Sequence, residues 1–103
     1  MTDKRWKKHE LKTAEALGGE RIPITGRQRG SAPDVAHDAL SIECKQRQVI
    51  PKWINEAMEQ AQASIKSPEQ VPIVVIHGTG MKYEDDYVML TMKDFKKIRW
   101  WDD

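Results

Sequence analysis

The chain has 103 residues, of which 39% are hydrophobic and 32% charged, and its formal net charge is +1. That length suffices for one compact domain and is too short for two. No apolar run approaches the roughly 18 residues that a membrane-spanning helix needs, and the charged amino terminus has no apolar stretch behind it, which argues against a secretory signal or transit peptide. We therefore expect one cytoplasmic domain over residues 1–103, with no membrane association.

The chain has one cysteine, Cys44, and three scattered histidines, which limits the kinds of metal site that it can form. One cysteine cannot form an internal disulfide, and no spacing of these residues matches a zinc site. We therefore do not expect zinc, whereas metals that are ligated by oxygen remain open.

Charge is unevenly distributed along the chain. Residues 1–52 carry eleven lysines and arginines against seven acidic residues, so the remaining residues are net acidic. A basic half favours a polyanionic partner, because lysine and arginine side chains that bind phosphates release counterions. Solvated lysines on an exposed helix explain the same charge equally well.

Residues 3–17 predict an amphipathic helix that ends at Gly18 and Gly19. At about 100° per residue, one stripe of this helix carries Trp6, Glu10, Thr13, Ala14 and Leu17. Glu10 thus lies within the apolar stripe, where its carboxylate must be hydrogen-bonded, paired or linked to a metal because burying it alone is costly. Glu15 projects to the opposite side among lysines, so the two carboxylates are not equivalent.

Three short strands follow this helix. We expect them at residues 21–25, 34–37 and 40–45, with a polar loop over residues 26–31 and a tight turn that pairs the last two strands as an antiparallel hairpin. In the third strand, side chains alternate between two faces, with Leu40, Ile42 and Cys44 on the core face and Ser41, Glu43 and Lys45 on the other. One face of this strand is therefore core, and the other carries charge.

The second half of the chain continues the mixture of helices and strands. A helix is predicted from Pro51 to about residue 66, strands at residues 71–77 and 86–91, and a terminal helix or turn from residue 92 to about 100. This order implies an α/β fold with a mixed central β-sheet flanked by α-helices.

Asp34, Glu43 and Lys45 form the most distinctive chemical group in the chain. Phosphodiester hydrolysis puts charge on phosphate oxygens and needs an activated water, which a divalent cation held by carboxylates can provide with help from a nearby positive charge. A hairpin can set Asp34 and Glu43 on adjacent strands as ligands that Mg²⁺ accepts, and Lys45 points the same way as Glu43. The competing interpretation is a structural ion-pair cluster on a solvated sheet face.

Pro33-Asp34, followed after eight residues by Glu43-Cys44-Lys45, resembles the motif of the PD-(D/E)XK nuclease superfamily. The surrounding sequence is more specific, because five segments together resemble the small Holliday-junction-resolvase-like nucleases, including phage-encoded ones: residues 6–10, 17–23, 25–27, 33–35 and 42–45. The resemblance covers residues 6–62 well. It implies a restriction-endonuclease-like core, Mg²⁺ with Mn²⁺ as a substitute, a homodimer, and a bacterial or phage-infected host cell.

The resemblance also implies a metal site made by Glu10, Asp34 and Glu43, with Lys45 as a fourth catalytic residue. In such nucleases the first helix contributes a glutamate to the metal site, and Glu10 matches it by position. A salt bridge to a lysine at the helix edge is the alternative explanation for this carboxylate.

Further positions complete the expected site. Thr25 and Gln60 match accessory polar residues of related nucleases, although Thr25 otherwise begins the loop and Gln60 otherwise faces solvent. The candidates for contact with DNA phosphates are five basic residues: Arg27 and Arg29 in the loop, together with Lys7, Lys8 and Arg47. The two loop arginines are equally consistent with an ordinary solvated loop.

The sequence therefore predicts a Mg²⁺-dependent endonuclease that hydrolyses DNA phosphodiesters, with branched or junction DNA as the substrate by resemblance. Symmetric incision of a four-way junction needs two sites, which a homodimer supplies. Three alternatives stay open: a restriction or repair endonuclease on duplex DNA, an inactive DNA-binding module on the same scaffold, and a protein-interaction subunit whose charged cluster is structural.

Overall fold

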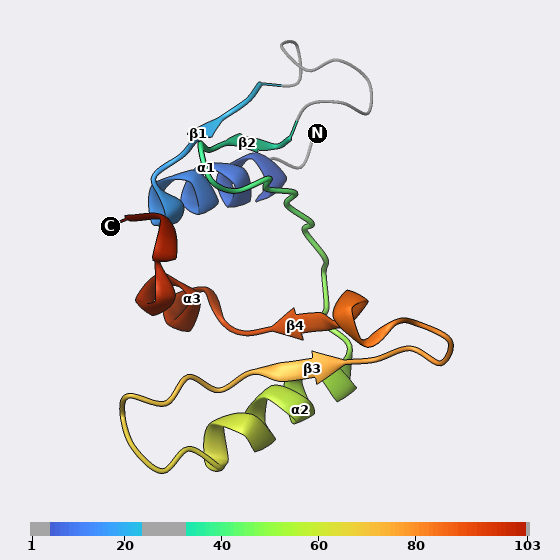
Figure 1. Ribbon diagram of the computed structural model, residues 1–103. Helices are drawn as coiled ribbons and strands as arrows, with labels where there is room; N and C mark the ends of the chain where they lie inside the picture. The colour runs from blue at the N-terminus through green and yellow to red at the C-terminus, as the bar shows by residue number, and fades with distance from the viewer. Residues whose placement is uncertain (1–4, 24–32, 103) are drawn as a thin grey trace. The chain divides into compact units, whose positions relative to one another are not determined.

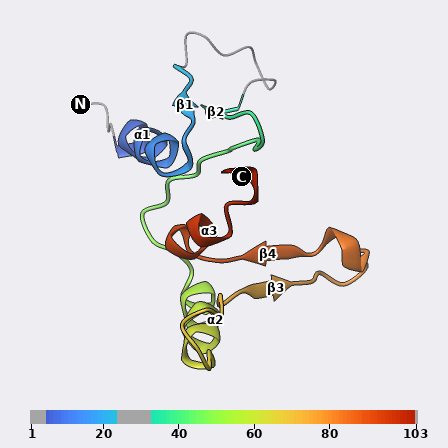
Figure 2. The same cartoon turned by 60° about the vertical axis from the view of Figure 1, so that its left-hand side comes forward.

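The computed structural model describes residues 5–23 and 33–102, and Figures 1 and 2 show its elements from two sides. The chain divides into two compact units, Met1–Gln48 and Val49–Asp103. Both combine helix with a two-stranded antiparallel sheet, which confirms the predicted mixed α/β class. The described strands pair two by two and not as one mixed sheet, and the two ladders extend over two and three residue pairs. Within these residues, no helix is long and apolar enough to cross a membrane.

Helix α1, Arg5–Leu17, is amphipathic as predicted. Its buried residues are four members of the predicted stripe: Glu10, Thr13, Ala14 and Leu17. The helix ends where the N–H groups of Gly18 and Gly19 both donate to the Ala14 carbonyl, and Gly18 takes a φ of 78°, which residues with a side chain rarely adopt. A Cβ on Gly19 would lie 2.4 Å from the carbonyl oxygen of Ala36, so only glycine permits this close approach.

Strands β1, Glu20–Arg21, and β2, Val35–Ala36, pair antiparallel after this turn. Val35 is fully buried and, together with Ala14 and Leu17, forms the apolar core of the described residues. Because this core is small, the polar residues beside it contribute a large share of what the unit buries.

The second arm of the predicted hairpin, residues 40–45, is reduced to one bridge. Ile42 pairs antiparallel with Val35, and its carbonyl accepts the N–H of Asp34 at 3.0 Å. Beyond Ile42, the N–H of Cys44 donates to the Asp34 carboxylate and not to a strand carbonyl, which ends the ladder. The predicted alternation still holds, because the less exposed residues are Leu40, Ile42 and Cys44, and the more exposed ones are Ser41, Glu43 and Lys45.

His37 ties the turn of this hairpin to α1. Its Nδ1 accepts the N–H groups of Ala39 and Leu40 at 3.0 and 3.2 Å, so the ring proton resides on Nε2. Nε2 then donates to the Leu17 carbonyl at 2.9 Å. His37 therefore fixes the hairpin against the carboxyl end of the helix.

The second unit contains two helices and two strands: α2, Lys52–Ala63; β3, Val74–Ile76; β4, Tyr87–Met89; and α3, Met92–Ile98. Short 3₁₀ turns, η2 and η3, span Tyr83–Asp85 and Trp100–Asp102. β3 and β4 pair antiparallel, and α2 contacts β3 (Figure 1). Each of these four elements is the helix or strand that the sequence predicts, and each is shorter than its predicted range.

Candidate active site

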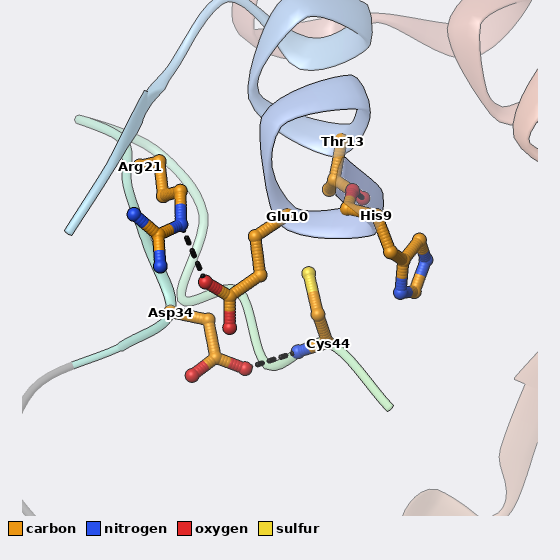
Figure 3. A network of polar contacts seen from close by, with 6 residues as sticks. All are labelled: His9, Glu10, Thr13, Arg21, Asp34 and Cys44. Carbon is orange, nitrogen blue, oxygen red and sulfur yellow. Dashed lines mark hydrogen bonds and ion pairs between the residues drawn. The ribbon is translucent and has the colours of Figure 1, made fainter. Parts of the chain in front are cut away.

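Glu10 lies in the buried stripe of α1 and is only 5% exposed. Its Oε1 accepts a hydrogen bond from Arg21 Nε at 2.8 Å, and both side chains are largely buried (Figure 3). The Arg21 guanidinium also lies 5.6 Å from the centre of the Trp6 ring, a cation–π contact. The Glu10 carboxylate is therefore paired, as its burial requires, with an arginine from β1.

Asp34 is the second buried carboxylate, at 7% exposed. It directly precedes β2, and its Oδ2 accepts the backbone N–H of Cys44 at 2.6 Å, a short charge-assisted bond. Figure 3 shows the carboxylates of Glu10 and Asp34 turned toward the same region, where α1 meets the hairpin. Two of the four predicted catalytic residues are thus brought to one place.

Cys44 lies beside both carboxylates (Figure 3). Burial raises the pKa of the thiol, against the effect of the Thr13 hydrogen bond. The charges of Asp34, Glu10 and Glu43 raise this pKa further. The thiol therefore keeps its proton to higher pH than a free cysteine, which disfavours the reactive thiolate. The sequence placed Cys44 in the core, whereas it is partly exposed and lies among polar groups.

Glu43 and Lys45 occupy the other face of their segment. Their side chains are 62% and 77% exposed, and their charged groups lie 3.7 Å apart. Among the residues that the structure describes, no three His, Cys, Asp or Glu side chains are arranged to hold a metal ion. The predicted set of Glu10, Asp34 and Glu43 is therefore not assembled here, because the hairpin ladder ends before Glu43 and leaves it turned to solvent.

The two accessory residues and the loop arginines were predicted to complete this site. Thr25, Arg27 and Arg29 lie outside the described residues. Gln60 lies on α2 in the second unit, where it is exposed. Its backbone carbonyl accepts a hydrogen bond from the Ser64 hydroxyl at 2.9 Å. The accessory role of Gln60 therefore stays a prediction.

The remaining predicted DNA contacts, Lys7, Lys8 and Arg47, differ in their surroundings. Lys7 Nζ lies 5.4 Å from the centre of the Trp6 ring. Lys8 and Arg47 are exposed, and Lys8 lines a hollow on the surface of the first unit. Neighbouring lysines of α1 thus have different environments, which their spacing of one residue, about 100° around the helix, explains.

Arg21 and Thr13 belong to this site, although neither is among the site residues predicted from sequence. Arg21 could have been suspected from sequence, because a buried Glu10 carboxylate needs a cation as its partner. Arg21 is the first basic residue after the helix. Thr13 shares the stripe with Glu10 one turn along, so the two face the same side of α1. Neither signal specifies the partner, since the contacts depend on how β1 and the hairpin cross the helix.

The site offers two buried carboxylates, a guanidinium, and an exposed Glu43–Lys45 pair on the adjoining face. Carboxylate oxygens are the donors that Mg²⁺ and Mn²⁺ prefer, and the positive side chains suit a phosphate. No protein-family model, curated protein or solved structure matches the chain. The function is therefore inferred from the chain's own residues.

Proposed function

We propose that this protein is a Mg²⁺-dependent DNA endonuclease with a restriction-endonuclease-like core, selective for Holliday junctions or other branched DNA. The observation that carries the proposal is the burial of Glu10 and Asp34, 5% and 7% exposed, where α1 meets the hairpin. Two buried carboxylates close together are unfavourable unless positive charge accompanies them. Arg21 supplies one positive charge, and a divalent cation would add to it.

Each buried residue has a distinct task in this proposal. When bound, Mg²⁺ would supply Lewis-acid stabilisation of the phosphate and activation of the attacking water. Glu10 and Asp34 would hold the ion through carboxylate oxygens, and Mn²⁺, which shares this preference, is expected to substitute. Arg21 orients the Glu10 carboxylate through its Nε hydrogen bond at 2.8 Å.

Glu43 and Lys45 contribute once their segment turns inward. Among the described residues, positions 43–45 take part in no strand pairing, so this reorientation breaks no ladder hydrogen bond, although it gives up the bond from the Cys44 N–H to the Asp34 carboxylate. Glu43 would then complete the set of carboxylates. Lys45 would present its ammonium group to the phosphate and stabilise the charge that develops in the transition state.

The resemblance to junction resolvases extends the proposal to the assembly. Cutting a four-way junction symmetrically requires two sites, so we expect a homodimer that acts in the cytoplasm of a bacterium or phage-infected cell. A second candidate, a DNA-binding module without activity, is favoured by one observation: within the described residues no three possible ligands converge on one point.

Cleavage of labelled DNA tests the proposal. Four-way junction, flap, single-stranded and duplex substrates are incubated with Mg²⁺, with Mn²⁺ and with a chelator, using the wild-type chain and Lys45→Ala. We expect metal-dependent cleavage of the junction that Lys45→Ala abolishes, with duplex cut more slowly. No cleavage of any substrate in either metal would leave the DNA-binding module, and equal rates on duplex and junction would identify a duplex endonuclease.

A further inference from the structure

A hollow of about 290 Å³ lies on the surface of the first unit. We name it the basic groove and define it by its lining residues, Arg5, Lys8, His9, Lys12 and Gln46. The first four occupy positions i, i+3, i+4 and i+7 of α1, which places them on one face of the helix. This face is separate from the buried stripe, since none of the four is among the buried residues Glu10, Thr13, Ala14 and Leu17.

The basic groove has positive charge and no acidic lining residue. Arg5, Lys8 and Lys12 are exposed at the surface. Lys12 pairs with Glu15 at 3.5 Å, but both side chains are well exposed, at 66% and 68%, so this pair is weak and yields to a stronger anion. Three cations on one helix face are typical of a site for an anion with several charged oxygens.

His9 provides an independent observation. Its Nδ1 atom is buried and has no hydrogen-bond partner within the described part of the chain. Its backbone carbonyl, in contrast, accepts the Thr13 hydroxyl at 2.8 Å. A buried ring nitrogen without a partner is unfavourable, and a phosphate oxygen seated in the groove would accept a hydrogen bond from Nδ1–H.

The length of the groove fits a nucleic-acid strand. Arg5 and Lys12 are seven residues apart, roughly 10 Å along the helix at about 1.5 Å per residue, which corresponds to about three nucleotides of one strand measured along the duplex axis, at about 3.4 Å each. Gln46 joins the groove to the carboxylates, because it continues the segment that Asp34 holds through the Cys44 N–H. A strand in the groove therefore leads toward the proposed catalytic residues.

We propose that the basic groove binds backbone phosphates of the DNA substrate and so positions the strand to be cut, a role that depends on the proposed function. Lys8 and Lys12 belong to this DNA interface, whereas Lys7, held beside the Trp6 ring at 5.4 Å, does not. Lys7 and Lys8 are adjacent and carry the same charge. They are therefore a matched pair for a test.

The test measures DNA affinity by fluorescence anisotropy with chelator present, so that no cleavage occurs. A labelled four-way junction is titrated at several salt concentrations with the wild type, Lys8→Gln, Lys7→Gln and the double variant Lys8→Gln/Lys12→Gln. We expect the slope of log affinity against log salt to fall by about 1 for Lys8→Gln and about 2 for the double variant. Lys7→Gln should leave the slope near its wild-type value.

Inorganic phosphate serves as a second probe, with the His9 ring signals followed by NMR. A shift of these signals on adding phosphate, together with unchanged DNA affinity in the lysine variants, would identify a small-anion site and overturn the DNA assignment. Equal losses of DNA affinity for Lys7→Gln and Lys8→Gln would show that net charge alone causes the effect, and would also overturn the assignment of the groove to DNA. The substituted side chains of Lys8 and Lys12 are exposed, so thermal melting should show that their variants fold as the wild type does.

The groove and the nuclease activity can fail independently. DNA binding that depends on Lys8 and Lys12, with no cleavage by the wild type, would remove the enzyme and support the groove. Cleavage with normal DNA affinity in the double variant would remove the groove and leave the enzyme intact.

Discussion

Among the residues of the second unit whose burial the structure describes, Asp94 is the buried acid, and its own helix explains why. Asp94 is 3% exposed, and it lies in the first turn of α3. Its N–H donates to the Thr91 hydroxyl at 3.3 Å, which caps the helix, and its Oδ1 lies 3.1 Å from Lys97 Nζ. The hydrogen bond with Lys97 lowers the pKa of Asp94, with a smaller contribution from Thr91. Every partner named here lies within one helical turn of Asp94.

The first unit buries Glu10 and Asp34 differently. Glu10 binds Arg21 eleven residues away, and Asp34 binds the Cys44 N–H ten residues away. No helix end accounts for either contact, so the fold has to bring these groups together. A buried acid is therefore not in itself a sign of function, whereas buried acids that converge from separate elements are candidates for it.

The largest expected effect comes from Glu10→Gln. The amide keeps the size of the side chain but removes the charge that a divalent cation needs, so DNA cleavage in Mg²⁺ should fall about 100-fold or more. Glu15→Gln, on the exposed side of α1, is the matched control and should keep the wild-type rate. Equal rates for the two variants would place Glu10 in the same structural class as Asp94.

Arg21→Gln should have the largest effect on stability. The substitution removes the cation that pairs with the buried Glu10 carboxylate, so the free energy of unfolding, measured in urea, should fall by about 3 kcal/mol. Lys12→Gln breaks only the exposed pair with Glu15 and should cost less than about 1 kcal/mol.

Metal addition to Arg21→Gln separates the two explanations for its pair with Glu10. If Glu10 holds a cation, Mg²⁺ replaces the missing positive charge, and it should raise the stability of the variant more than that of the wild type. Equal gains in both proteins would mark the pair as structural.

Local periodicity made part of this structure predictable from sequence. The burial of Glu10 and the exposure of Glu43 follow from helix and strand geometry, and both are observed. The length of the hairpin was not predictable, because a ladder depends on its partners. Here the Asp34 carboxylate takes the Cys44 N–H and ends the pairing early.

The arrangement of the site was less predictable than its residues. Glu10 and Asp34 were identified from spacing, but the pairing with Arg21 depends on the path of β1, which no local pattern encodes. Likewise, the sequence predicted a basic helix without distinguishing Lys7 from Lys8. The two lysines are distinguished only by the contact between Lys7 and Trp6 and by the position of the basic groove beside Lys8.

Thr91→Ala should have a smaller effect, confined to the local acid. The change removes the hydroxyl that caps α3 and bonds to Asp94, so the free energy of unfolding should fall by about 1 kcal/mol. Thr91→Ser keeps the hydroxyl and should restore most of the loss. DNA cleavage should stay at the wild-type rate in both variants, and a loss of cleavage would contradict the structural role of this acid.

The smallest effect concerns the Cys44 thiol at high pH. Because its pKa is raised in the folded chain, the unfolded chain loses this proton first, and stability should decline as pH rises from the ordinary value of 9.0 through the raised one. Cys44→Ala should remove this decline in urea unfolding measured at a series of pH values. Since the charges of Asp34 and Glu10 contribute to the raised pKa, Glu10→Gln should weaken the decline, whereas Asp94→Asn should leave it unchanged. Equal declines in those two variants would mean that Glu10 does not act on the thiol. The distinction between the converging acids of the first unit and the local acid Asp94 would then be wrong.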